Sequence, residues 1–233
     1  MGLKGSAFLA IWHDIAEGAH EEYIEWHTRE HMPERLSIPG FTTGKRLHAP
    51  DAGRHVFGTI YAGETLETFR SPAYLERLNT PTAWTAAVAP SFCNFLRVAC
   101  ERIAAAGHGD GGFMATVRLD FSGADAPAKL AEAAARLAGD ILALRGVCGV
   151  HVGVARAEVS NVPTRETELR STMSERGFDA VLLVEGSSRA GLGSALPQAE
   201  ALAVATGALA NPISLVYETA FSLTSEDMQA AGG

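Results

Sequence analysis

The chain has 233 residues, of which 47% are hydrophobic and 20% are charged, as in an ordinary globular protein of one large or two small domains. Its formal net charge of −8 disfavours nucleic acid and anionic membranes as partners, because both attract basic surfaces. It shows neither a signal-peptide pattern nor an apolar run of about 18 residues that could cross a membrane. We therefore expect a cytoplasmic protein that acts on a small molecule.

The first half predicts the order β-α-β-β-α-β. Its elements are a strand at 6–13, a helix at 19–37, strands at 41–48 and 55–61, a helix at 65–78 with a helical stretch at 84–88, and a strand at 93–100. A turn is expected at Pro39 and Gly40, between the first helix and the second strand.

The second half predicts the same order. Its elements are a strand at 113–121, a helix at 127–144, strands at 147–154 and 180–185, a helix at 198–206 and a strand at 214–221. The extra length at 156–177 is polar and is interpreted as an elongated hairpin loop. Domain boundaries follow: a first repeat at 1–106, a glycine-rich linker at 107–112 and a second repeat at 113–233.

Three cysteines, Cys93, Cys100 and Cys148, form no CxxC pair, and an odd number makes a poor disulfide framework. We expect reduced thiols that pack as small core residues. A catalytic cysteine is the less favoured alternative.

One segment of the first half carries a recognisable pattern, WHTREHMPERL from Trp26, followed by IPGF from Ile38 and by Arg46. It resembles EthD-like members of the dimeric α/β-barrel superfamily, in which a WHxxEHxP helix leads through PGF into the second strand. The resemblance implies an α+β fold: two ferredoxin-like βαββαβ repeats, duplicated in tandem, that form an intrachain α/β-barrel with antiparallel sheets. In the second half only the order of elements matches.

The first helix is expected to turn ionisable residues inward. At 100° per residue, Tyr23, His27, Glu30, His31 and Glu34 share one face. Neighbours three and four apart lie about 5–6 Å from each other, so several of them can contact one small molecule. Burying imidazoles and carboxylates costs free energy unless they are paired, which predicts a polar pocket between helix and sheet.

Three features of this helix have alternative interpretations. Pro33 either kinks or ends the helix, or opens a fresh helical turn. Trp26 is either a core anchor or a substrate contact. The histidines themselves are either chemical groups of the pocket or structural residues bonded to the backbone.

Further pocket residues are expected from the strands. Arg46 and His48 share one strand face, where Arg46 is a candidate anion clamp. Tyr61 is a candidate hydrogen-bond donor to an oxyanion. Trp12 and its neighbour in the first strand point to opposite sides, so only one can meet the helix, and Trp12 is taken as the substrate contact. His151, in the second repeat, is interpreted as a core residue or a degenerate site.

The run from His27 to His31 also reads H-x-x-E-H, a zinc-peptidase pattern. Pro33 and the PGF continuation argue against a peptidase, because the long helix of such enzymes is missing. A non-peptidase metal site on His27 and His31 is an open alternative.

Three functions therefore compete. The leading one is a small-molecule enzyme without an organic cofactor, in which His27, His31 and Glu30 perform acid–base chemistry and Arg46 stabilises charge, as in an isomerase, cyclase or lyase acting on an aromatic, polyketide-like or lactone substrate. The alternatives are an EthD-like non-catalytic accessory protein of a degradation pathway, and a metal-dependent lyase or oxygenase. No cofactor and no resident metal are expected, and the two-repeat chain is expected to form a homodimer.

Overall fold

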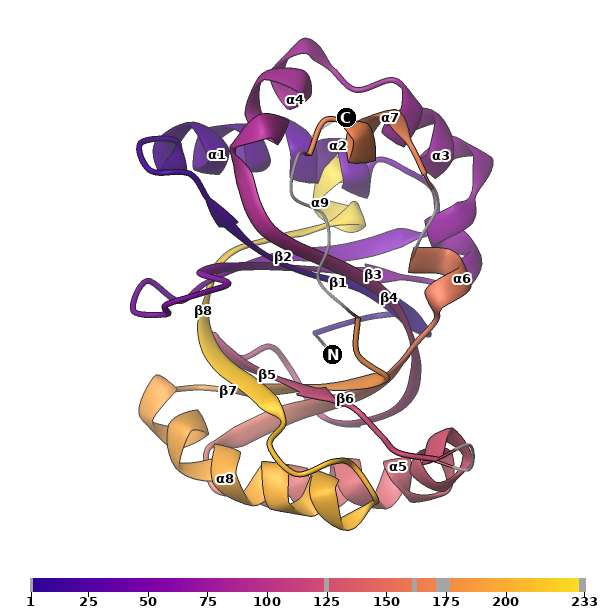
Figure 1. Cartoon of the computed structure of the whole chain (residues 1–233), viewed down its shortest axis with the longest axis vertical. Helices are drawn as coiled ribbons and strands as arrows, with labels where there is room; N and C mark the ends of the chain where they lie inside the picture. Colours follow the sequence, from indigo (N-terminus) through magenta and orange to yellow (C-terminus); the bar gives the residue numbers. More distant parts are fainter. Residues whose placement is uncertain (1, 124–125, 161–162, 171–176, 231–233) are drawn as a thin grey trace. The chain divides into compact units, whose positions relative to one another are not determined.

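The computed structural model describes residues 2–123, 126–160, 163–170 and 177–230, which form a mixed α+β fold (Figure 1). The strand pairings among the described residues are antiparallel. The predicted fold class is confirmed. No helix among the described residues is long and apolar enough to cross a membrane.

The chain divides into two compact units. The N-terminal unit comprises Leu3–Ala99, Arg156–Gly177 and Ala220–Gly233, and the C-terminal unit comprises Met1–Gly2, Cys100–Ala155 and Phe178–Thr219. The strand order β-α-β-β-α-β occurs once in each half of the sequence. Cys93, Cys100 and Cys148 form no disulfide, and Cys100 is buried.

The N-terminal unit is built on three paired strands. β3 (Phe57–Gly63) lies between β1 (Ala7–Ile15) and β2 (Phe41–His48), antiparallel to both. Its other elements are η2 (Leu66–Arg70), α3 (Pro72–Asn79), α4 (Ala83–Val88), η3 (Ala89–Ser91), the first part of β4 (Phe92–Gly107), the end of β8 (Ile213–Thr224) and α9 (Ser225–Ala230). The predicted helix at 65–78 is thus divided, because Pro72 begins a new helix that Ser71 caps by accepting a bond from the Tyr74 amide.

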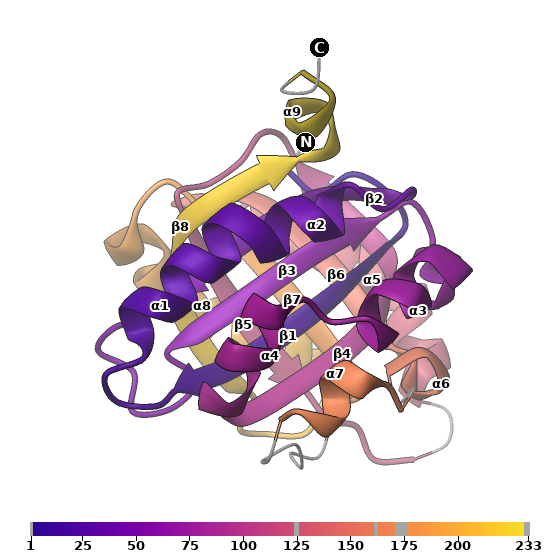
Figure 2. The same cartoon turned by 90° about the horizontal axis from the view of Figure 1, so that it is seen from above.

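The helix that carries the WHTREH motif is continuous but changes type. It consists of α1 (His20–Trp26), a π-helical turn η1 (His27–His31) and α2 (Met32–Leu36), and Figure 2 shows them as one ribbon. The Met32 amide bonds to the His27 carbonyl, five residues back, which defines the π turn. Pro33 opens α2, where a missing N–H costs little, so it does not end the helix.

The C-terminal unit repeats the arrangement. β7 (Ala180–Gly186) lies between β5 (Phe113–Leu119) and β6 (Val147–Ala155), and α5 (Ala126–Leu142) and α8 (Arg189–Ala205) complete it. α8 is longer than the predicted 198–206. Glycines and Pro197 weaken its sequence signal, whereas the Ser188 cap and the burial of Leu192 and Ala195 stabilise it.

The polar segment at 156–177 is more than the hairpin loop that the sequence predicted. It contains two short helices, α6 (Ala157–Ser160) and α7 (Arg165–Glu168), and it belongs to the N-terminal unit; residues 161–162 and 171–176 lie outside the described part. The Arg165 amide donates to the Asn79 side chain at 3.2 Å, and Arg97 donates to the Ser160 carbonyl at 2.8 Å. The segment is thereby held against α3 and β4.

Candidate active site

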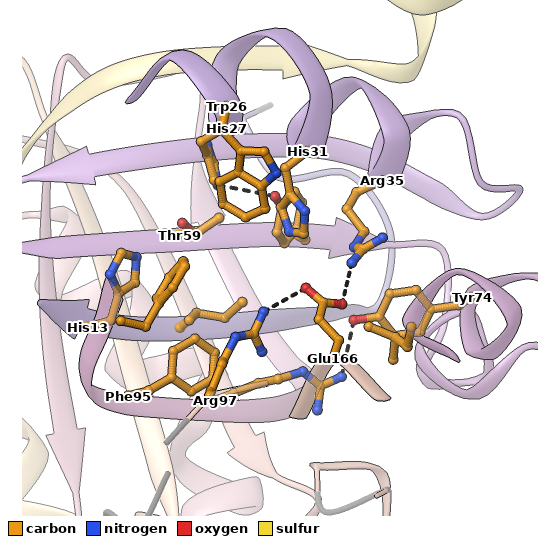
Figure 3. Close-up of a pocket in the computed structure, with 15 residues that line it drawn as sticks. His13, Trp26, His27, His31, Arg35, Thr59, Tyr74, Phe95, Arg97 and Glu166 are labelled. Carbon is orange, nitrogen blue, oxygen red and sulfur yellow. Dashed lines mark hydrogen bonds and ion pairs between the residues drawn. The ribbon is translucent and has the colours of Figure 1, made fainter. Parts of the chain in front are cut away.

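A cavity lies inside the N-terminal unit, beneath the WHTREH helix (Figure 3). Its walls come from β1, β3, the helix from α1 to α2, α3, the start of β4 and the segment around α7. The lining residues are Ile11, His13, Trp26, His27, His31, Arg35, Thr59, Tyr61, Tyr74, Leu78, Phe92, Phe95, Arg97, Glu166 and Arg170. A cavity with both aromatic walls and convergent polar groups is the usual form of a small-molecule site.

Three buried histidines face this cavity. His13, His27 and His31 are only 1%, 3% and 7% exposed. Nε2 of His13 shares a 3.2 Å hydrogen bond with the Tyr23 hydroxyl, and Nε2 of His27 shares one of 3.3 Å with the Tyr61 hydroxyl. Nδ1 of each of the three rings is buried without a hydrogen-bond partner among the described residues.

His31 differs from the other two histidines. Neither of its ring nitrogens makes a hydrogen bond to a described residue, and its ring lies 4.2 Å from the Trp26 ring, centroid to centroid, tilted by 32°. Its centroid is 5.7 Å from that of His27, and both rings line the cavity. His31 therefore offers a free imidazole beside an aromatic wall.

Burial keeps all three imidazoles neutral at neutral pH. Desolvation lowers the pKa of His13 from 6.5 to about 3. Desolvation, and then the nearby Arg35, hold the pKa of His31 well below its ordinary value. Desolvation, together with the charge that His31 would carry, does the same to the pKa of His27. A neutral imidazole has one nitrogen that can accept a proton, so each ring is a base over the physiological pH range.

A buried ion triad lines part of the cavity. The Glu166 carboxylate accepts one bond from Arg35 and one from Arg170, both 2.6 Å long. The side chains of Glu166, Arg35 and Arg170 are 1%, 4% and 8% exposed. Arg170 also lies over the Phe95 ring at 4.4 Å, and a second acid, Glu34, accepts from Arg35 at 2.9 Å. Figure 3 shows Arg35 and Glu166 pointing towards each other.

Electrostatics favour a charged Arg35. Burial opposes its charge, but the neighbouring Glu166, Tyr74 and Glu34 hold its pKa above the ordinary value. Burial lowers the pKa of Arg170, against the opposing effect of Glu166. Arginine starts from so high a pKa that both guanidiniums are charged at neutral pH.

Four of the ten residues expected from the sequence line the cavity: Trp26, His27, His31 and Tyr61. A fifth, Tyr23, lies behind them and shares a hydrogen bond with the lining residue His13.

The other five do not line the cavity. Glu30 accepts a 2.5 Å bond from the Thr82 hydroxyl, and Glu34 pairs with Arg35. Arg46, expected as an anion clamp, donates to the Ile24 carbonyl at 3.2 Å and to the Thr28 hydroxyl at 2.7 Å, which braces the helix.

His48 stacks on Phe57 at 4.8 Å. Trp12 is buried and its strand neighbour His13 lines the cavity instead, as the alternation of strand side chains requires. In the C-terminal unit, His151 is buried with Nε2 3.4 Å from a Glu185 oxygen.

Sequence reasoning did not select Arg35, Glu166 or Arg170. Arg35 follows His31 by four residues, so helical spacing alone could have included it. Glu166 and Arg170 lie in the segment interpreted as a loop, and no local pattern links them to a helix more than 130 residues earlier.

Among the residues that the structure describes, no three His, Cys, Asp or Glu side chains are grouped as a metal ion would require. The metal alternative on His27 and His31 stays a prediction.

Known proteins resemble this chain in structure. No protein-family model and no curated protein matches its sequence. An anthrone oxidase-like protein superposes with a TM-score of 0.63 at 9% identity, covering 94% of this chain and 92% of its own. A candidate monooxygenase from Lactobacillus acidophilus NCFM gives 0.59 at 12% identity, covering 95% and 97%, and one from Fusobacterium nucleatum gives 0.55 at 10%, covering 95% and 98%. Such low identities establish the shared barrel fold of ferredoxin-like units and nothing further.

Proposed function

We propose that this chain is an enzyme that removes a proton from a small planar molecule, with His31 as the base and Arg35 as the group that stabilises the resulting anion. The observation that carries the proposal is the position of His31. It is a neutral imidazole, unbonded to any described residue, in a cavity it shares with a buried guanidinium on the same helix.

The chemistry follows from these two groups. A carbon acid next to a carbonyl gives its proton to a His31 nitrogen, and the electron pair moves to the carbonyl oxygen to form an enolate. Arg35 bonds Glu34 through one terminal nitrogen and Glu166 through the other, and each of these nitrogens carries a second N–H that can bond the enolate oxygen.

Because of its burial, the cavity stabilises the charges of the transition state more than it would stabilise a charged His31 alone. An isolated imidazolium is unfavourable in the cavity, as the low pKa of His31 shows. An imidazolium beside a newly formed enolate is stabilised by that negative charge. Arg35 opposes the charge on His31 but stabilises the enolate itself. Preorganised charges that act only as the anion forms are the main source of such catalysis.

Proton removal from carbon is compatible with the isomerase, cyclase or lyase expected from the sequence. Proton removal begins isomerisations and cyclisations, and it also begins the oxidation of electron-rich carbon acids of the kind that an anthrone oxidase-like name implies. We include in the proposal that the chain is EthD-like, that its halves arose by tandem duplication, and that its substrate is aromatic, polyketide-like or a lactone.

Solvent exchange tests the function without knowledge of the natural product. Anthrone, cyclohexane-1,3-dione and an unsaturated lactone are incubated in D2O with the protein, and loss of the acidic C–H signal is followed by NMR. We expect the protein to accelerate exchange in at least one compound. The control is His108→Ala, because His108 is exposed and is not a lining residue of the cavity; this variant should exchange as fast as the unaltered protein. If no compound exchanges faster than in buffer containing the same concentration of free imidazole, the proposal is wrong.

A further inference from the structure

The cavity has an excess of positive charge. Arg35, Arg97 and Arg170 line it, whereas Glu166 is the one acidic side chain among its lining residues. Glu34 also bonds Arg35, but it is not part of the lining. Arg97 donates to two neutral oxygens, the Ser160 carbonyl at 2.8 Å and the Tyr74 hydroxyl at 3.4 Å. Arg97 is half-buried, and no described carboxylate forms an ion pair with it, so the described lining carries a positive charge that an anion would balance.

One hydrogen-bond donor of the cavity also lacks a negatively charged or polar partner in the described part of the chain. Nε of Arg170 is buried without a hydrogen-bond acceptor among the described residues, and the whole side chain is only 8% exposed. An N–H of a guanidinium left without an acceptor costs free energy that a bound oxygen would recover. The donor and the charge excess therefore identify the same missing partner, an anionic oxygen.

The remaining walls limit the shape of this partner. Trp26, Phe92, Phe95, Ile11 and Leu78 supply aromatic and aliphatic surface. The centres of water-sized molecules can occupy about 40 Å³ of the cavity. One buried water needs roughly 10–15 Å³ of such volume, so the space holds about three waters, close to the volume of a single ring.

We propose that the cavity binds a small aromatic anion, with its carboxylate or phenolate oxygen at Arg170 and Arg35 and its ring against Trp26, Phe92 and Phe95. The role of this anion as a substrate rests on the proposed proton-transfer function. The binding itself depends only on charge and shape.

Isothermal titration calorimetry with benzoate, benzamide and acetate tests the proposal. Benzamide has the shape of benzoate without the charge, and acetate has the charge without the ring. Because hydrogen bonds to charged partners are worth more than neutral ones, we expect benzoate to bind about 10- to 100-fold more tightly than benzamide, and acetate to bind more weakly than benzoate. Titration of 4-nitrophenol above and below its own pKa extends the test to phenolates, with tighter binding expected for the ionised form.

Two variants locate the site. Arg170→Gln keeps much of the side chain and can still bond Glu166, so it is expected to fold and to lose most of the preference for benzoate over benzamide. Arg29→Gln removes an arginine whose side chain is 70% exposed and is expected to change nothing. Equal affinities of benzoate and benzamide for the unaltered protein overturn the proposal, as does an unchanged preference in folded Arg170→Gln. Benzoate has no enolisable hydrogen, so these outcomes are independent of the exchange assay.

Discussion

Replacing Glu166 with alanine is expected to lower the free energy of unfolding by about 3–5 kcal/mol, because it leaves two buried guanidiniums without their shared carboxylate. Glu166 is 1% exposed and accepts bonds of 2.6 Å from both Arg35 and Arg170. The loss should appear in urea unfolding as a lower midpoint, with a similar slope if α7 keeps its place.

A matched control separates this effect from ordinary loss of an acidic residue. Glu168 lies on the same short helix, but its side chain is 66% exposed and its partner Arg165 is 71% exposed. Glu168→Ala should therefore cost less than about 1 kcal/mol. If Glu166→Ala is no more destabilising than Glu168→Ala, the ion triad does not hold the segment in place.

Replacing His31 with alanine is expected to slow the protein-catalysed proton exchange by about 10²- to 10⁴-fold, the usual contribution of a general base. Arg35 and the aromatic walls are retained, so substrate should still bind while the acceptor of the proton is lost. Free imidazole added to His31→Ala should restore part of the rate, because the substitution opens a space of the right shape for it.

His27→Ala provides the comparison. The Nε2 atom of His27 is bonded to Tyr61, so His27 is less available as a base, and its removal should slow exchange far less than removal of His31. Circular dichroism of both variants checks that they are folded. Rates of His31→Ala within about twofold of the unaltered protein would show that the base lies elsewhere.

Patterns in the sequence predicted the order of the elements, and the resemblance carried by the WHTREH segment added the fold class. Short apolar runs indicated the strands, and β2 begins and ends at the predicted residues. Helical spacing grouped His27 and His31, and both line the cavity. Such inferences succeed because each depends on residues close together in the chain.

The rest of the site depends on interactions that no local pattern records. The π turn at His27–His31 adds a residue to one turn, which rotates the residues around it relative to an ideal α-helix. Glu30 accordingly bonds Thr82 rather than facing the cavity. Glu166 and Arg170 come from the segment at 156–177, whose polar composition is typical of a loop, and only packing against α3 and β4 brings them to Arg35.

The pH dependence of exchange tests most directly whether His31 is the base. Because burial and Arg35 lower the pKa of His31, the neutral form persists as the pH falls through 6.5, and it is lost only when the pH falls through the lowered value. For the free enzyme, kcat/KM of the exchanging compound should thus stay constant from about pH 8 to about pH 6 and decline only in more acidic solution. A decline centred at or above pH 6.5, the ordinary value for histidine, would contradict the assignment of a buried His31 as the proton acceptor.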